Sequence, residues 1–240
     1  QSYVMEIDAL ALALPDNVLE YIWFDACLMS SVETFHALRR KCRYLVASPT
    51  NVLAEAQYDA SGIPYSKVLP YLFGGKEELV KACGSYMEHY RSRKYPILRS
   101  ASITLADAGQ LDSLYHTVRT LLKGNLSSLA TLNKEGIQVY HTGKEPQVFF
   151  DMSGILKKAV SGNSQAYETF ENQLRRTVLY RDATDKIINE LVINSAQHSG
   201  LSMYLPQAAW KNTREYRYYF EKMEWAGVYS QLDPLRLSLP

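Results

Sequence analysis

The chain has 240 residues, of which 47% are hydrophobic and 21% are charged, and its formal net charge is +1. This composition is typical of a globular protein and excludes a disordered or fibrous chain. A charge so close to zero offers no global attraction to nucleic acid or anionic membranes. No apolar run reaches the ~20 residues that a membrane span needs.

Two elements are predicted at the start of the chain. Apolar residues between Val4 and Leu14 recur at helical spacing, and Pro15 ends the pattern. The aromatic and β-branched run at 19–24 then predicts a buried strand.

A second strand follows after one helix. Ser30 and Glu33 have the spacing of a capping box, which predicts a helix from there to about residue 40. Residues 44–47 predict the next strand, closed by Ser48-Pro49-Thr50. A strand, helix, strand unit is typical of a parallel sheet with crossover helices, so we expect an α/β fold.

The rest of the chain continues this alternation, after a polar loop at 51–63. Helices are expected at 64–72, 76–92, 107–122, 152–160, 164–175 and 212–224, and strands at 102–105, 136–150, 176–181 and 201–205. The last helix mixes basic and aromatic residues. Helical periodicity puts Tyr216, Tyr219, Phe220 and Met223 on one stripe, which indicates packing and not nucleic-acid binding.

Three cysteines, Cys27, Cys42 and Cys83, show no spacing for a metal site or disulfide framework. Cys27 follows the first predicted strand and precedes a helix. Reactive groups collect at the carboxyl ends of parallel strands, and a helix N-terminus favours a thiolate. The alternative is that Cys27 is a small apolar residue, as cysteines behind buried strands often are.

Asp25 lies two residues before Cys27. Side chains alternate along a strand, so Asp25 and Cys27 are expected to project to the same face, ~6–7 Å apart along it. An ionised carboxylate there needs a positive partner, either an internal arginine or the basic side chain of a ligand.

These residues carry a resemblance to a known family. Phe24-Asp25-Ala26-Cys27-Leu28-Met29-Ser30-Ser31-Val32-Glu33 resembles the nucleophile segment of clostripain-like cysteine peptidases, which share the caspase fold. The resemblance extends through Leu45–Thr50, Ile63–Tyr65 and Ser199–Pro206, over nearly the whole chain.

The resemblance implies a three-layer α/β/α sandwich with a mostly parallel central sheet. It also implies an endopeptidase that cuts after Arg or Lys in protein or peptide substrates, with Cys27 as nucleophile and Asp25 in the substrate-binding pocket. In the loop after Pro49, Glu55 or Asp59 would supply a second substrate-binding acid. No metal or organic cofactor is implied, and calcium dependence, which some relatives show, is left open.

A cysteine peptidase also needs a histidine, which in this family precedes the cysteine. All five histidines here follow Cys27. Many members are cut between the two, so we expect residues 1–240 to be an autoprocessed heavy chain whose light chain carries the histidine and completes the sheet. The N-terminal Gln1-Ser2-Tyr3 agrees with a cut precursor. The rival is that a local histidine serves, His198 being the best candidate and His36 a weaker one.

The resemblance makes the chain one peptidase domain, with residues from about 130 to 240 as an elaboration packed on it. Relatives are exported, which implies a secreted or envelope-attached bacterial protein. The alternative function is a non-catalytic module in which Asp25 binds basic peptides and Cys27 is a relic.

Overall fold

A four-stranded sheet forms the centre of the protein. The computed structural model describes residues 5–53, 63–125, 128–129, 132–141, 147–160, 163–188, 190–206 and 212–229. In spatial order the strands are β1 (Leu19–Trp23), β2 (Cys42–Ala47), β3 (Ser102–Asp107) and β5 (Val178–Ala183). β1 and β2 pair in parallel, whereas β3 is antiparallel to β2 and β5. Three of these strands therefore run in one direction, and the sheet is mixed.

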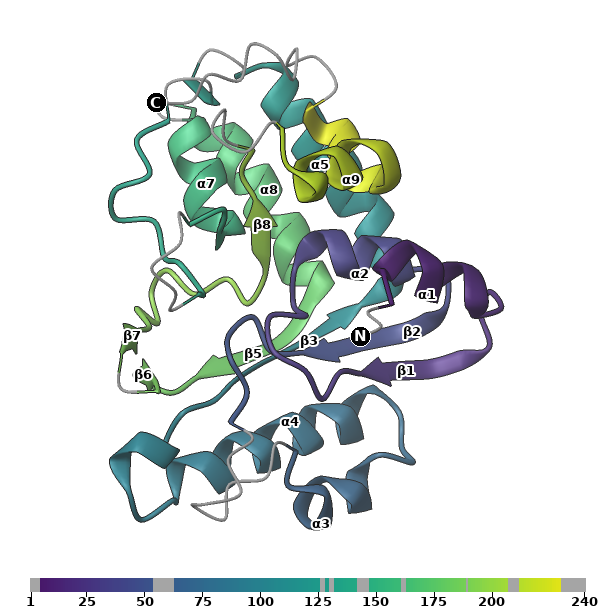
Figure 1. Cartoon of the computed structure of the whole chain (residues 1–240), viewed down its shortest axis with the longest axis vertical. Helices are drawn as coiled ribbons and strands as arrows, with labels where there is room; N and C mark the ends of the chain where they lie inside the picture. Colours follow the sequence, from purple (N-terminus) through teal and green to yellow (C-terminus); the bar gives the residue numbers. More distant parts are fainter. Residues whose placement is uncertain are drawn as a thin grey trace.

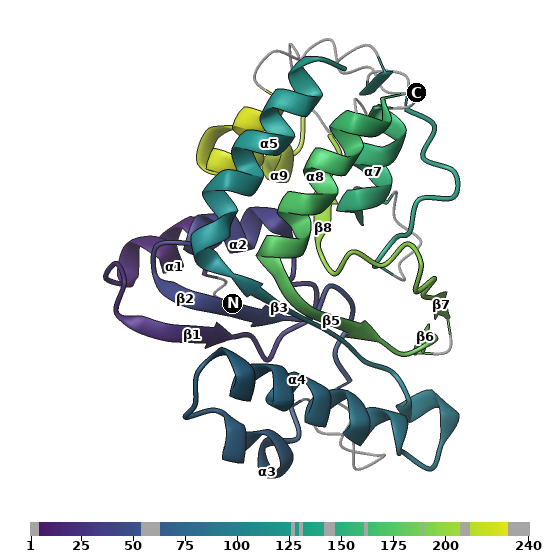
Figure 2. The same ribbon diagram turned by 180° about the vertical axis from the view of Figure 1, so that it is seen from behind.

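Helices cover both faces of this sheet (Figures 1 and 2), which confirms the expected three-layer α/β class. One face carries α3 (Tyr65–Val68), the 3-10 turn η2 (Leu69–Tyr71) and α4 (Lys76–Arg91). The other carries α1 (Ile7–Ala13), α2 (Val32–Leu38), α5 (Leu111–Lys123) and α8 (Ser164–Thr177).

β2 is buried on both faces, because alternate side chains enter two different cores. Leu45 and Ala47 belong to the core beneath α2 and α5, whereas Tyr44 and Val46 belong to the core beneath α4. This double burial explains why the strand is a continuous apolar run.

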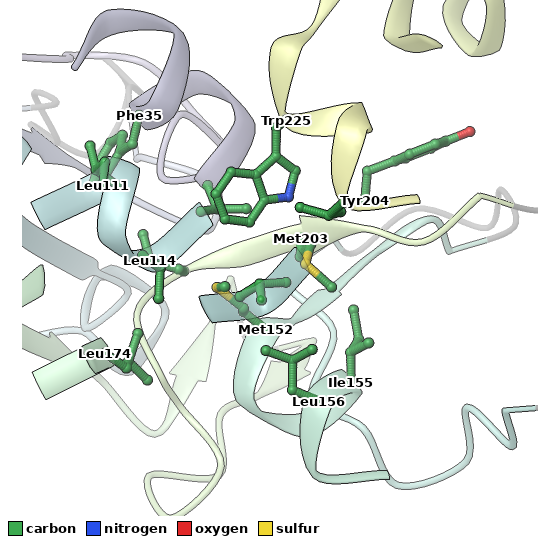
Figure 3. Packing of buried hydrophobic residues seen from close by; sticks show 14 of the residues in the cluster. Phe35, Leu111, Leu114, Met152, Ile155, Leu156, Leu174, Met203, Tyr204 and Trp225 are labelled. Carbon is green, nitrogen blue, oxygen red and sulfur yellow. The ribbon is translucent and has the colours of Figure 1, made fainter. Parts of the chain in front are cut away.

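The C-terminal half adds a second, smaller layer above α2 and α5. Its elements are β4 (Phe149–Asp151), α7 (Met152–Ala159), β8 (Ser202–Tyr204), α9 (Arg214–Lys222) and the 3-10 helix η6 (Glu224–Tyr229). β4 and β8 pair with each other, and Trp225 packs between this layer and Phe35 and Leu111 (Figure 3). β5 also comes from this half, so residues beyond 130 contribute to the central sheet as well.

The predicted elements recur with local differences. Residues 64–72 divide into α3 and η2, and η4 (Ala108–Gln110) precedes α5. Within the described part of 136–150, β4 and an isolated bridge between Val139 and Phe150 replace the expected strands. The remaining short elements are η3 (Pro96–Leu98), β6 (Lys186–Ile187) and β7 (Leu191–Val192). No helix in the described ranges has the length and apolarity to cross a membrane.

The expected cap of α2 was wrong by one residue. Ser31 is the N-cap, and its hydroxyl accepts from the Thr34 N–H (3.2 Å). The Ser30 hydroxyl instead donates to the Gly200 carbonyl (2.8 Å), and Glu33 accepts from the Tyr204 N–H (2.8 Å). The Ser30 hydroxyl and the Glu33 carboxylate therefore make long-range hydrogen bonds instead of capping α2.

Gly200 allows a test of this long-range connection. Its φ is +86°, and an added Cβ would lie 2.7 Å from Thr104 Oγ1. Gly200→Ala should therefore lower the free energy of unfolding by about 3 kcal/mol, from left-handed strain plus a clash. Gly136 is the matched control, because its φ is +73° but no atom lies within 4 Å of the added Cβ. Gly136→Ala should cost only about 1 kcal/mol in the same urea titration, and equal losses would contradict the packing argument.

Candidate active site

The candidate site is the loop that follows β1. β1 ends at Trp23, so Asp25 and Cys27 lie in this loop and not on the strand, as the alternation argument assumed. Both side chains are exposed. Leu28 then adopts a left-handed φ of 62°, which turns the chain toward α2. The two residues still share one loop at the carboxyl end of a parallel strand pair.

Backbone hydrogen bonds hold the loop along its length. The N–H groups of Phe24, Leu28 and Ser30 donate to the carbonyls of Val46 (2.9 Å), Thr50 (3.0 Å) and Ser48 (3.1 Å) respectively. The loop therefore runs beside the segment that leaves β2, and its position is set by that segment.

Cys27 differs from the other two cysteines in its surroundings. The Val52 N–H donates to its sulfur (3.2 Å), and Sγ also lies 3.8 Å from the Val52 carbonyl. A thiolate accepts such a bond more strongly than a neutral thiol does. Cys42 and Cys83 are buried and free; burial raises the pKa of Cys42 to about 11 and that of Cys83 further. Cys27 is thus the one cysteine with access to a substrate.

Asp25 has a hydroxyl partner but no positive one in the described residues. The Tyr65 hydroxyl, at the start of α3, donates to its carboxylate (3.0 Å). None of the ion pairs found in these ranges includes Asp25. Burial raises the pKa of Tyr90, on α4, to about 12, and the nearby Asp25 charge adds to the rise. The carboxylate is therefore available to a positive ligand.

The two histidines considered as local partners lie in the core. His36 stacks on Tyr115, with 5.0 Å between ring centroids, and burial lowers its pKa to about 4. His198 Nδ1 lies 2.9 Å from the Tyr140 hydroxyl, and burial likewise lowers its pKa to about 4. The hydrogen bonds found for Cys27 are both to Val52, so neither histidine activates it in this structure.

Glu55 and Asp59 lie outside the described residues. Within the described ranges, no group of three or more His, Cys, Asp or Glu side chains is placed to hold a metal ion.

Two contacts of this site, those of Tyr65 and of the Val52 amide, are absent from the sequence-based prediction. Tyr65 lies in the Ile63–Tyr65 segment that carries the resemblance, which was a usable signal. A backbone amide has no sequence signature.

The layered α/β fold places an exposed cysteine beyond the carboxyl end of a parallel strand. This placement suits the class of proteins that use a thiol as the reactive group. The model of the clostripain family (peptidase C11) matches residues 1–234. The chain belongs to this family of cysteine peptidases.

Solved structures of cysteine proteases share the fold. A cysteine protease from B. fragilis superposes with a TM-score of 0.81 at 23% identity, over 99% of this chain and 97% of that one. An inactive zymogen C11 protease from Parabacteroides distasonis gives 0.77 at 25% identity, over 93% and 62%. A clostripain from Bacteroides thetaiotaomicron gives 0.74 at 24%, over 94% and 95%. A search of curated protein sequences gives no significant match.

Glu33, in the first turn of α2, provides a pH test of the packing behind the site. Burial raises the pKa of its carboxyl from 4.5 to about 7, against the opposing effect of the Tyr204 N–H. The unfolded chain releases this proton at lower pH, so Glu33 makes stability fall as the pH rises from about 4.5 to 7.

Glu33→Gln removes this dependence. Between pH 5 and 8, wild type should lose about 2–3 kcal/mol of unfolding free energy relative to the variant. The two buried histidines are common to both proteins and cancel in the difference, which urea titrations at each pH would measure. A difference that stays constant with pH would contradict the raised pKa.

Proposed function

We propose that the chain is the heavy chain of an endopeptidase that cleaves after Arg or Lys, with Cys27 as nucleophile and Asp25 as the carboxylate that binds the substrate cation. The observation that carries this proposal is the pair itself, an exposed thiol and an exposed carboxylate in one loop, the carboxylate having no basic partner among the residues that the structure describes. The clostripain from Bacteroides thetaiotaomicron was solved with the peptide inhibitor BTN-VLTK-AOMK, whose peptide part ends in lysine. That inhibitor supports a basic residue before the scissile bond here too.

In the proposed reaction the cationic side chain of the substrate Arg or Lys pairs with Asp25. The Cys27 thiolate attacks the carbonyl carbon of that same residue. The negative charge on the carbonyl oxygen is stabilised by backbone N–H groups. The histidine of the light chain protonates the leaving amine, which leaves a thioester on Cys27. Water then attacks the thioester, releasing the acid product and the free thiol.

The light chain is proposed to join the sheet at β1. Within the described residues β1 is an edge strand, paired with β2 alone, and most of its side chains are only half-buried. An uncovered edge strand offers unpaired N–H and C=O groups to another strand. A strand added there would end beside the loop that bears Cys27, where a histidine is required.

Processing and export belong to the same proposal. Among the similar structures is an inactive zymogen of a C11 protease, which supports activation from a precursor here too. The proposal adds that the enzyme cuts this precursor itself, into a light and a heavy chain. Another is described as a secreted C11 protease from Bacteroides thetaiotaomicron, which supports export of this protein.

The catalytic pair is tested with an arginine-directed, thiol-reactive affinity probe on the processed protein. Labelling should map to Cys27 by mass spectrometry and disappear in Cys27→Ala. Asp25→Asn should lower kcat/KM for basic substrates by about 100-fold or more, because the substrate cation loses its charged partner. Alkylation of Cys27 by neutral iodoacetamide should persist in that variant.

Asp16→Asn is the matched control, since it also removes an exposed carboxylate but one that pairs with Lys41. A glutamate-directed probe should not label wild type. Absence of any labelling in the folded, processed protein would overturn the peptidase proposal and favour the peptide-binding module.

The position of the light chain is tested by hydrogen exchange with single-residue resolution. In the processed two-chain protein, every amide of β1 should exchange slowly, because both edges of the strand are then paired. If only the amides bonded to β2 are protected, the light chain does not pair with β1.

A further inference from the structure

Three buried hydroxyls meet beneath the loop that carries Cys27. Ser48, Thr50 and Ser102 are each at most 1% exposed. Ser102 Oγ lies 2.8 Å from Ser48 Oγ and 2.7 Å from Thr50 Oγ1, and the latter two oxygens are 3.3 Å apart. Ser102 is the first residue of β3, whereas the other two lie in the segment after β2. The group therefore joins that segment to the neighbouring strand.

Among the described residues, the Ser102 hydroxyl has hydrogen bonds only to the other two hydroxyls, whereas the Thr50 hydroxyl also donates to the Asn51 carbonyl (3.3 Å). The Ser48 hydroxyl also donates to the Thr50 carbonyl (3.1 Å) and accepts from the Thr50 N–H (3.2 Å). Ser102 contributes its hydroxyl to both neighbours. Because a buried hydroxyl without a partner is costly, the three together fix the conformation of the segment.

The same segment supplies the contacts of the Cys27 loop. The Thr50 carbonyl accepts from the Leu28 N–H (3.0 Å), directly after the cysteine. Two residues further on, the Val52 N–H donates to Cys27 Sγ (3.2 Å). The three hydroxyls thus fix the segment that makes both bonds, the one from the Leu28 N–H and the one to the sulfur.

We propose that Ser102 is a positioning residue that, through Thr50, holds the Val52 amide on the sulfur of Cys27. The proposal rests on Cys27 being the nucleophile. Loss of the Ser102 hydroxyl lets the segment relax and moves the Val52 N–H away from Sγ. The thiolate then lacks one donor, while Asp25 keeps its contact with Tyr65 on a different element.

The test uses the processed protein with Ser102→Ala and Thr50→Val, each of which removes one hydroxyl of the group. The expected result is a pH midpoint of Cys27 alkylation by iodoacetamide about half a unit or more above wild type. With an arginine substrate, kcat should fall about tenfold, the size expected for a lost hydrogen bond to a charged group, and KM should change less than about twofold. Asp25, the charged group on the same loop, is retained throughout.

Ser100→Ala is the matched control. Ser100 is equally buried (1% exposed), and its hydroxyl accepts from the Ile188 N–H (2.9 Å), away from the Cys27 loop. This variant should keep the wild-type alkylation profile. Thr50→Ser, which retains the hydroxyl, should keep it as well.

Three results would overturn the proposal. One is a wild-type alkylation profile in folded Ser102→Ala and Thr50→Val. Another is an equal shift in Ser100→Ala, and the third is a loss of reactivity that only follows the loss of folded protein in thermal melts. Failure of wild type itself to label at Cys27 is a different outcome, and would instead remove the proposed nucleophile.

Discussion

The hydrogen bonds to the Gly200 carbonyl are the constraint on which the site depends. This oxygen accepts from the hydroxyls of Ser30 (2.8 Å) and Thr104 (2.6 Å), at a residue whose φ is +86°. The Ser202 N–H returns a bond to the Ser30 carbonyl (3.0 Å). The end of the Cys27 loop is thereby tied to β3 and to β8, so the C-terminal half takes part in building a candidate site whose residues lie near the N-terminus.

The helix that follows the loop is fixed at both ends by polar contacts. At its start Glu33 is buried and reaches the backbone of Tyr204, and after its end Arg39 pairs with Asp112 and Glu224. A buried carboxylate is costly unless its hydrogen bonds are satisfied, and here it takes up a proton more readily than in solution. Burial of Glu33 therefore lowers the stability of the fold but orients α2 against β8, and that orientation keeps the Cys27 loop in place.

The strand, helix, strand unit could be predicted from sequence because its pattern is local. Leu45 and Val46 enter different cores, so the strand is apolar throughout and easy to recognise. The cap of α2 was misplaced because Ser30 bonds to a residue 170 positions away. A capping pattern assumes local partners, and it fails where a distant carbonyl competes for the hydroxyl.

In the candidate site, too, local features could be predicted from sequence and long-range contacts could not. Asp25 and Cys27 are recognisable because their chemistry is in their side chains, although the strand ended before them and alternation did not apply. The donor at the sulfur is a main-chain amide, which any residue at position 52 could supply. Its direction is set by hydroxyls of Thr50 and Ser102, brought together across two strands. Sequence therefore identifies the side chains proposed to react, whereas the packing behind them decides how such a side chain is held. That packing becomes visible only once β2 and β3 are paired.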